Sequence, residues 1–298
     1  MLRPESHILT SVTTEKVEGM IEDTLSQTDI VKVEFEDGIA WVTLNRPEKR
    51  NCLNPATNDL MHAVLDDLET DARCKVLVLT GADPSFCAGM DLKEYFEETA
   101  AQGHMATRKA QRSSYGWFRR LRWFERPTIA AVNGWCFGGA FGPLYSCDLA
   151  IAADEAVFGV SEINWGIIPG GNVTKVLAEL MNFRDAMYYI LTGETFDGRR
   201  AAEMGLVNYS VPKAELKDAV RKMAGKLLDK NPETLKAAKD AFRRVLEMPV
   251  DAAEDYLVVR QEALNWLDKS GGREKGLKQF IHDKTYKPGL GAYDINKK

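Results

Sequence analysis

The feature that most constrains this chain of 298 residues is a series of short apolar runs that alternate with amphipathic segments. Runs at 75–80, 128–132 and 148–152 each suit one buried strand and are too short for a buried helix. Segments between them, such as 106–124, have the periodicity of helices. Strands that alternate with helices are typical of an α/β layered fold with a largely parallel sheet.

The first part of the chain contains turn and cap signals. Two runs with strand character flank Asp37-Gly38 within 31–44, which predicts a β-hairpin. Asn54-Pro55 is typical of a helix start, and an apolar stripe that continues to Leu68 predicts a helix there. Another helix is expected to begin near Asp91.

The part of the chain from about residue 175 onward differs in character. Amphipathic helical segments follow one another, and within it only 206–211 has the composition of a strand. The expected helices cover about 175–190, 198–204, 213–229, 232–246, 251–268 and 272–281. We therefore expect three parts: an N-terminal extension over 1–28, an α/β core over 29–210 and a C-terminal helical region over 211–298.

Composition argues against several classes of protein. Apolar residues make up 45% and charged residues 28%, an ordinary globular balance. The 39 Lys and Arg against 44 Asp and Glu give a net charge of −5, so no nucleic-acid partner is expected. The five cysteines are odd in number and lack CxxC spacing, which argues against a disulfide framework and favours the reducing cytoplasm. The first thirty residues show no secretory signal.

One uncharged stretch, 128–147, has to be compared with a membrane span. Gly134, Gly138 and Gly142 fall four residues apart, as in the packing face of some transmembrane helices. The glycines together with Pro143 make one continuous helix unfavourable. A buried strand, a glycine turn and a helix start explain the stretch better, and no membrane partner is expected.

Two loops lead from a strand region into an expected helix start. The GxxxGG pattern over 134–139 fits neither the dinucleotide-binding fingerprint nor a P-loop. It does place backbone N–H groups at a helix N-terminus, where they can stabilise a developing oxyanion. Residues 87–92 offer a second set of N–H groups in the same way. The alternative is that these glycines only permit close packing of helix on strand.

Glu162 is the carboxylate with the most distinctive surroundings. Apolar neighbours such as Phe158 and Ile163 should raise its pKa, which suits a group that exchanges protons near neutral pH. The alternative is an acid that caps a helix or lies in a loop. The four histidines, His7, His62, His104 and His282, have neither metal-ligand spacing nor a GxSxG partner, so we expect surface histidines and no metal site.

Four segments, in order, resemble the enoyl-CoA hydratase/isomerase (crotonase) superfamily. They are NRPEKRN at 45–51, FCAGMDLKEYF at 86–96, VNGWCFGGAFGPL at 132–144 and VFGVSEINWGIIPGG at 157–171. GETFDGRRAAEMGLVN at 193–208 and the helices after it extend the resemblance over about 31–293. The resemblance implies a crotonase-like spiral of ββα units with a helical C-terminal trimerisation region, assembled as a homotrimer or a dimer of trimers.

Within the superfamily, AGMDLKEYF, NGWCFGG and SEINWG are most similar to the hydroxycinnamoyl-CoA (feruloyl-CoA) hydratase-lyases. Those enzymes hydrate a 4-hydroxycinnamoyl-CoA and cleave the product by retro-aldol to an aldehyde such as vanillin and to acetyl-CoA. The CoA belongs to the substrate, so no separate cofactor is expected.

The resemblance also implies roles for individual residues. The N–H groups of Met90 and Gly139 would form an oxyanion hole for the thioester carbonyl, and Glu162 would be the catalytic glutamate. Tyr95 would hydrogen-bond the 4-hydroxyl of the substrate. Further residues would bind the CoA part (Lys49, Ala88 and Leu92) or line the acyl pocket (Ser161, Trp165 and Gly170).

Three positions depart from the family pattern. Gly142 stands where simple enoyl-CoA hydratases carry a second glutamate and where hydratase-lyases have a small hydroxyl residue, which excludes a two-glutamate mechanism. Val258 stands at the position of a second phenol-binding tyrosine, with Tyr256 two positions earlier, and 167–170 reads IIPG in place of IPPG.

These departures leave alternatives open. Tyr95 favours a phenolic substrate, whereas Gly142 and Val258 favour a hydratase, retro-aldol lyase or isomerase that acts on another acyl-CoA. A non-catalytic member that serves as a binding scaffold would be expected to lack the catalytic acid, and the presence of Glu162 argues against it.

Overall fold

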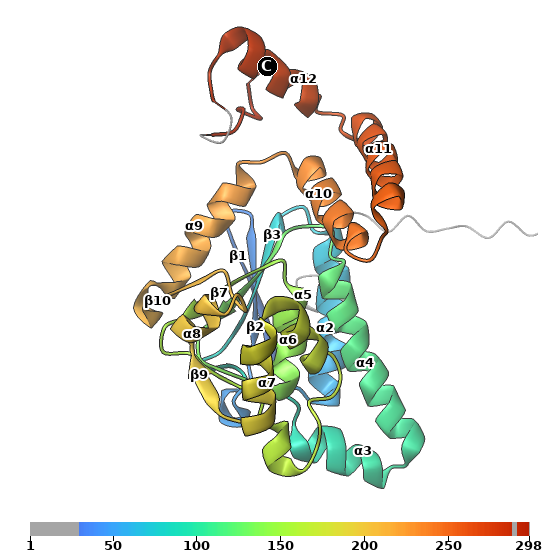
Figure 1. Ribbon diagram of the computed structural model, residues 1–298, viewed down its shortest axis with the longest axis vertical. Coiled ribbons are helices and arrows are strands. Elements are labelled where there is room, and N and C mark those ends of the chain that lie inside the picture. The colour runs from blue at the N-terminus through green and yellow to red at the C-terminus, as the bar shows by residue number, and fades with distance from the viewer. Residues whose placement is uncertain (1–29, 288–290, 298) are drawn as a thin grey trace, which may run out of the picture.

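The computed structural model describes residues 30–287 and 291–297 (Figure 1). The expected N-terminal extension over 1–28 lies outside these residues. One sheet has six strands in the order β1-β2-β3-β5-β7-β10, and a second has four in the order β4-β6-β8-β9. The first contains β1 (Val31–Glu36), β2 (Ile39–Leu44), β3 (Val76–Gly81), β5 (Thr128–Val132), β7 (Leu149–Ala153) and β10 (Tyr209–Val211). The second contains β4 (Ser85–Cys87), β6 (Trp135–Phe137), β8 (Val157–Gly159) and β9 (Thr195–Asp197).

The strand predictions for the large sheet are confirmed. β1 and β2 form the expected antiparallel hairpin, and both turn residues, Asp37 and Gly38, have the positive φ that a tight hairpin turn requires. The strands β2, β3, β5 and β7 pair in parallel, as the alternation of strand and helix predicts. The strand expected over 206–211 is shorter, since β10 begins only at Tyr209.

The small sheet was not predicted. The loop expected at 87–92 begins with the last residue of the three-residue strand β4, and β6, β8 and β9 are equally short. Each unit of the spiral contributes one strand to the large sheet and the next strand to the small sheet: β3 and β4, β5 and β6, β7 and β8. Because β4, β6 and β8 run parallel, the loops that follow them leave the sheet at the same edge.

Helices cover the sheets and continue beyond them. The longer ones are α2 (Pro55–Thr70), α4 (His104–Arg122), α6 (Val173–Leu180), α7 (Phe183–Thr192), α9 (Leu216–Leu228), α10 (Pro232–Val245) and α11 (Val250–Leu267). Short ones are η1 (Pro47–Lys49), η2 (Leu92–Glu97), α3 (Glu98–Ala101), η3 (Gly138–Ala140), α5 (Phe141–Ser146), η4 (Glu162–Trp165), α8 (Gly198–Glu203), η5 (Lys213–Glu215), α12 (Gly272–Leu277) and η6 (Lys278–Asp283).

Capping explains where several helices begin, and it corrects one prediction. Asn54 caps α2, since its side chain accepts a hydrogen bond from Thr57 N. The single helix expected over 175–190 is two helices, because the Asn182 side chain accepts from the N–H groups of Arg184 and Asp185 and starts α7 there. The helix expected near Asp91 is η2, a π-helix that Asp91 caps.

Helix α4 is packed against α2 by its buried face. Trp117 is fully buried and donates from its indole nitrogen to Asn58 Oδ1 on α2, at 2.8 Å. His62, expected at the surface, is partly buried in this contact, with its Nε2 2.9 Å from the carbonyl oxygen of Ser113. The surface prediction is therefore wrong for His62, whereas His104 and His282 are exposed and His7 lies outside the described residues.

The C-terminal helices pack less and less against the core along the chain. Helix α9 packs on the large sheet through Leu216, Val220 and Ala224, whereas α11 buries none of its residues. In Figure 1, α11 and α12 extend away from the sheets. Apolar side chains on α11 remain exposed, Trp266 to 79%. Among the residues that the structure describes, no helix is long and apolar enough to cross a membrane.

Candidate active site

Three of the predicted site residues lie on the loops that follow β4, β6 and β8. Met90 comes three residues after β4 ends, Gly139 two residues after β6 and Glu162 three residues after β8. A β-carbon at position 139 would lie 3.3 Å from the nitrogen of Met90, and one at position 138 would lie 3.0 Å from Glu162 Oε1. The parallel pairing of three short strands therefore brings together residues that are up to 72 positions apart, from 90 to 162.

The amides of Met90 and Gly139 are oriented by the backbone around them. Leu53 N donates to the Gly89 carbonyl at 2.8 Å, and Asp91 N donates to the Leu53 carbonyl at 2.9 Å. This parallel bridge uses the groups on both sides of Met90 and leaves the Met90 N–H directed away from Leu53. Gly139 lies in the first turn of η3, where an N–H has no acceptor within the helix.

Glycine is required where these loops approach each other. Gly89 has φ of +94° and Gly138 has φ of +48°, conformations that favour glycine. A β-carbon at position 89 would lie only 2.8 Å from the carbonyl oxygen of Phe137. Gly89 and Gly138 therefore allow the backbones of the two loops to approach closely. This close approach brings the amides of Met90 and Gly139 near each other.

Glu162 begins η4 and is partly buried beside Gly138. Burial raises the pKa of Glu162 above its ordinary value. Its Oε2 atom is buried and has no hydrogen-bond partner among the described residues. An unpartnered carboxylate oxygen of raised pKa beside two amide donors is suited to moving a proton to or from a bound molecule.

The residues expected near the CoA part lie beside the Met90 loop. Ala88 N donates to the Arg50 carbonyl at 3.0 Å, which joins the Lys49 loop to the β4 loop. The side chains of Lys49 and Leu92 are exposed. Arg50 was not among the predicted site residues, and its guanidinium lies 4.3 Å from the ring centre of Trp135. The consecutive cations in NRPEKRN were the available signal for a second positive group here.

The residues expected in the acyl pocket occupy the loop after β8 and the helix η2. Ser161 precedes η4 and is partly buried, while Trp165 and Gly170 are exposed, Trp165 to 67%. Tyr95 is buried, and its hydroxyl lies 2.9 Å from Ser114 Oγ on α4. The structure thus places Tyr95 against α4 rather than in open solvent.

Two positions that depart from the family pattern, Gly142 and Val258, can be interpreted from the structure. A β-carbon at Gly142 would lie 2.6 Å from the Phe118 ring, so this ring fills the space that a side chain at 142 would use. Val258 was expected to stand with Tyr95 at the phenol site. It is 60% exposed on α11, and Figure 1 shows α11 and α3, which directly follows the Tyr95 helix, at opposite ends of the molecule. Within one chain, therefore, Val258 does not contact Tyr95.

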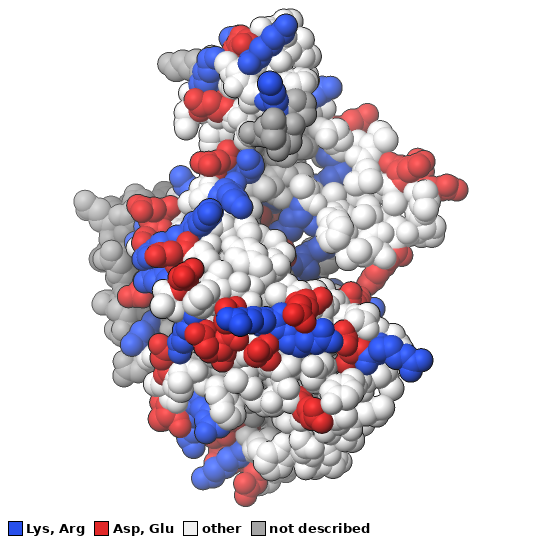
Figure 2. Space-filling model, turned by 60° about the vertical axis from the view of Figure 1, so that its left-hand side comes forward, with Lys and Arg blue, Asp and Glu red and all other residues white. Residues whose placement is uncertain are grey.

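A cavity of about 1260 Å³ lies elsewhere, between the core and α10. Lys and Arg atoms are visible in the hollow between the C-terminal helices and the rest of the molecule (Figure 2). None of the predicted site residues lines this cavity. The Asp148 carboxylate there is fully engaged, with Lys239 at 2.7 Å and Arg243 at 2.8 Å, and it accepts two hydrogen bonds from Thr128. Among the residues that the structure describes, Glu162 is the carboxylate with a buried oxygen that lacks a hydrogen-bond partner.

A spiral of ββα units that brings Met90 and Gly139 close to the partly buried Glu162 is the arrangement that the crotonase resemblance predicts. The model of the family "Enoyl-CoA hydratase/isomerase" matches residues 34–287, and this chain belongs to that family. The resemblance predicted from the motifs is therefore confirmed, as is the crotonase fold.

Relatives and solved structures agree with this assignment. A hydroxycinnamoyl-CoA hydratase-lyase of Pseudomonas fluorescens is 54% identical over 88% of this chain and 96% of its own. A short-chain-enoyl-CoA hydratase of Clostridium acetobutylicum is 34% identical over 84% of this chain and 94% of its own. The crystal structure of an enoyl-CoA hydratase from Bacillus anthracis superposes with a TM-score of 0.78 at 27% identity, covering 89% of this chain and 99% of that one.

Proposed function

We propose that this enzyme hydrates a 4-hydroxycinnamoyl-CoA, such as feruloyl-CoA or p-coumaroyl-CoA, and cleaves the product to a hydroxybenzaldehyde and acetyl-CoA. The observation that carries the proposal is the placing of Met90 N, Gly139 N and the Glu162 carboxylate together at one edge of the small sheet. The 54% identity to a hydroxycinnamoyl-CoA hydratase-lyase supports the choice of substrate.

In the first step, water adds across the double bond that is conjugated to the thioester. Glu162 takes a proton from the water, whose oxygen bonds to the β-carbon, and electron density moves onto the carbonyl oxygen. The N–H groups of Met90 and Gly139 stabilise this enolate. The proton held by Glu162 then passes to the α-carbon, and the product is the β-hydroxyacyl-CoA.

In the second step, the bond between the α- and β-carbons breaks. Glu162 removes the proton of the β-hydroxyl, the C–O bond becomes the aldehyde carbonyl, and the electron pair returns to the same thioester enolate. Protonation of the α-carbon by Glu162 releases acetyl-CoA. One oxyanion hole and one carboxylate thus serve both steps, and this chemistry needs no cofactor beyond the CoA of the substrate.

The ends of the substrate are assigned to the two sides of this site. Lys49 and Arg50 supply positive charge beside Ala88, where the phosphates of CoA would bind. At the other end, the phenol would meet Tyr95 near the loop that contains Ser161, Trp165 and Gly170. We further propose a homotrimer or dimer of trimers in the cytoplasm; all five cysteines are free, which fits a reducing compartment.

A second candidate is hydration, retro-aldol cleavage or isomerisation of another acyl-CoA. The observation that favours it is the exposure of Val258 on α11, away from Tyr95, because a single chain then has no second phenol-binding group from α11 beside Tyr95. The chemistry at Glu162 would be unchanged, and only the acyl group would differ.

Product analysis separates the two candidates. Pure protein is incubated with feruloyl-CoA, p-coumaroyl-CoA and crotonyl-CoA, and the products are separated by chromatography. We expect aldehyde and acetyl-CoA from the first two esters. Hydration of crotonyl-CoA with no aldehyde from either aromatic ester would overturn the lyase assignment in favour of the second candidate.

A further inference from the structure

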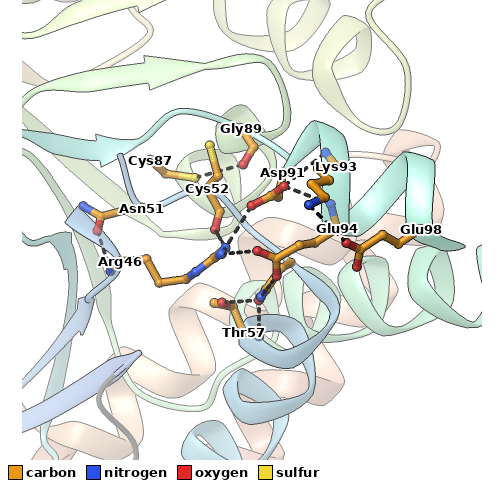
Figure 3. Close-up of polar contacts among 11 residues, drawn as sticks. Arg46, Asn51, Cys52, Thr57, Cys87, Gly89, Asp91, Lys93, Glu94 and Glu98 are labelled. Atoms are coloured by element: carbon orange, nitrogen blue, oxygen red, sulfur yellow. Dashed lines mark hydrogen bonds and ion pairs between the residues drawn. The ribbon is translucent and has the colours of Figure 1, made fainter. Parts of the chain in front are cut away.

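Arg46 is a buried cation directly behind the Met90 loop. It follows β2, and its side chain is only 8% exposed. Nη2 lies 2.7 Å from Glu94 Oε1 and 3.3 Å from Asp91 Oδ2, and Nη1 donates to the Cys52 carbonyl at 2.8 Å. Figure 3 shows the guanidinium pointing between these three acceptors; Cys52 and Asp91 adjoin the bridged residues Leu53 and Met90, and Glu94 lies on η2.

The same contacts determine where the Met90 amide points. Asp91 accepts from the N–H groups of Lys93 and Glu94, and so starts η2 immediately after Met90. Cys52 immediately precedes Leu53, whose two backbone hydrogen bonds flank Met90. Arg46 therefore links Cys52, which precedes Leu53, to Asp91, which follows Met90. The peptide that carries the Met90 N–H lies between Gly89 and Asp91, which are both hydrogen-bonded to Leu53.

The charges around Arg46 also bear on the reaction. Two carboxylates, Asp91 and Glu94, share this single guanidinium, while Lys93 lies farther out and pairs with Glu98 at 3.9 Å. Burial by itself raises the pKa of Asp91, but the amides of Glu94 and Lys93 and the charge of Arg46 outweigh it and hold the pKa below its ordinary value. Without Arg46, two anionic groups would stand uncompensated behind the oxyanion hole and would oppose a developing enolate.

We infer that Arg46 is a positioning residue for catalysis: it holds the Met90 amide on the thioester oxygen and neutralises the carboxylates behind it. This inference rests on the proposed function, because it assumes that the Met90 amide is part of the oxyanion hole. It adds Arg46 as a residue that acts without contacting the substrate. Because an oxyanion hole acts on the transition state more than on the bound ester, loss of Arg46 should lower kcat with little change in KM.

The test uses three variants and two reactions. The variants are Arg46→Met, which removes charge and hydrogen bonds; Arg46→Lys, which keeps the charge; and Asp91→Asn, which keeps a helix-capping side chain. The reactions are feruloyl-CoA cleavage and exchange of the α-protons of acetyl-CoA with D₂O, followed by NMR. The exchange needs only Glu162 and the oxyanion hole, so it does not depend on recognition of the aromatic ring.

We expect Arg46→Met to lower kcat in both reactions by about 10- to 100-fold, less than the roughly 10²–10³-fold effect of deleting an oxyanion donor. KM should stay within about threefold, and Arg46→Lys should recover part of the loss. Arg120→Met is the matched control, since Arg120 also pairs with two carboxylates, Asp66 and Glu69, but on α2 and away from the loop. It should leave kcat unchanged.

The outcomes are distinguishable. A folded Arg46→Met protein with parental kcat, or with raised KM alone, would overturn the inference and leave the proposed function intact. If Arg46→Met does not fold, an Asp91→Asn protein with parental kcat overturns the inference equally. A parent protein that neither cleaves feruloyl-CoA nor exchanges acetyl-CoA protons would overturn the proposed function and the inference together.

Discussion

The hydroxyl of Tyr95 on η2 lies 2.9 Å from Ser114 Oγ on α4, and either hydroxyl can donate in this hydrogen bond. Ser114 Oγ donates its single hydrogen to the Gln111 carbonyl, 3.0 Å away in the same helix. We infer that Tyr95 donates to Ser114 in this arrangement, so that the Tyr95 oxygen retains only acceptor capacity. A phenolic substrate that reaches Tyr95 must donate its own hydroxyl hydrogen, which a methyl ether cannot do.

This geometry predicts how Ser114 affects selectivity. Ser114→Ala should free the Tyr95 hydrogen, so that Tyr95 can donate to an ether oxygen. The ratio of kcat/KM for feruloyl-CoA to that for its 4-O-methyl ether should then fall by about 2- to 10-fold, the value of one neutral hydrogen bond. Tyr95→Phe should lower the ratio similarly, and Tyr209→Phe on β10 is the control. An unchanged ratio in both variants would remove Tyr95 from the substrate pocket.

The contact between Gly142 and Phe118 predicts a clash that a second substitution relieves. Gly142→Ala would bring a β-carbon to 2.6 Å from a ring that is only 3% exposed, so it should destabilise the protein by about 1–3 kcal/mol. In the Phe118→Leu background, Gly142→Ala should lower the free energy of unfolding by a smaller amount. Urea unfolding measures both effects.

Gly225→Ala is the matched control for this comparison. Nothing lies within 4 Å of a β-carbon at position 225 on α9, so the change should stabilise the helix by about 0.5–1 kcal/mol. Equal destabilisation by Gly142→Ala in both backgrounds would show that the Phe118 ring moves freely and does not hold this space.

The large sheet and the small sheet differ in how far they could be predicted. The runs that form β3, β5 and β7 are five or six residues long, enough for an apolar pattern to be recognised. β4, β6, β8 and β9 have three residues each, too few for any periodicity. Loop chemistry singled out Met90, Gly139 and Glu162, but their meeting depends on three of these short strands.

Contacts between residues far apart in the chain could not be predicted from the sequence either. Gly142 was noticed only as a departure from a family pattern, because Phe118, 24 positions earlier, gives no sign of its contact with it. Arg46 was part of a recognised motif without a role, since its partners Asp91 and Glu94 lie 45 and 48 positions away. The chemistry of a residue is readable in the sequence, whereas its partner is set by the fold.

Replacing the proposed catalytic carboxylate should abolish most turnover. Glu162→Gln keeps the shape of the side chain but cannot shuttle a proton, so kcat should fall by about 10²–10⁴-fold. Binding of the CoA ester, measured by calorimetry, should change little. A near-native rate would show that Glu162 has a structural role and that the mechanism is wrong.

The raised pKa of Glu162 predicts a pH-dependent stability difference for the same variant. A carboxyl group whose pKa is higher in the folded state destabilises the fold once it is ionised, and has no such effect below the unfolded pKa, about 4.3. Glu162→Gln should therefore raise Tm at pH 8, and the gain should shrink as pH falls through the folded pKa and vanish near pH 4. A Tm difference that is constant from pH 4 to pH 8 would contradict the raised pKa.

The exposed apolar face of the C-terminal helices predicts assembly. Val250, Val258 and Trp266 on α11 are 60–79% exposed, as is Phe242 on α10 at 65%, and exposed apolar side chains gathered on neighbouring helices can mark an interface between proteins. We expect a trimer or hexamer by light scattering, and Trp266→Glu should shift it toward smaller species. Met105→Glu on α4, where the parent side chain is 77% exposed, is the matched control. A parent protein that stays monomeric at every concentration, or a control that dissociates as readily as Trp266→Glu, would contradict a C-terminal interface.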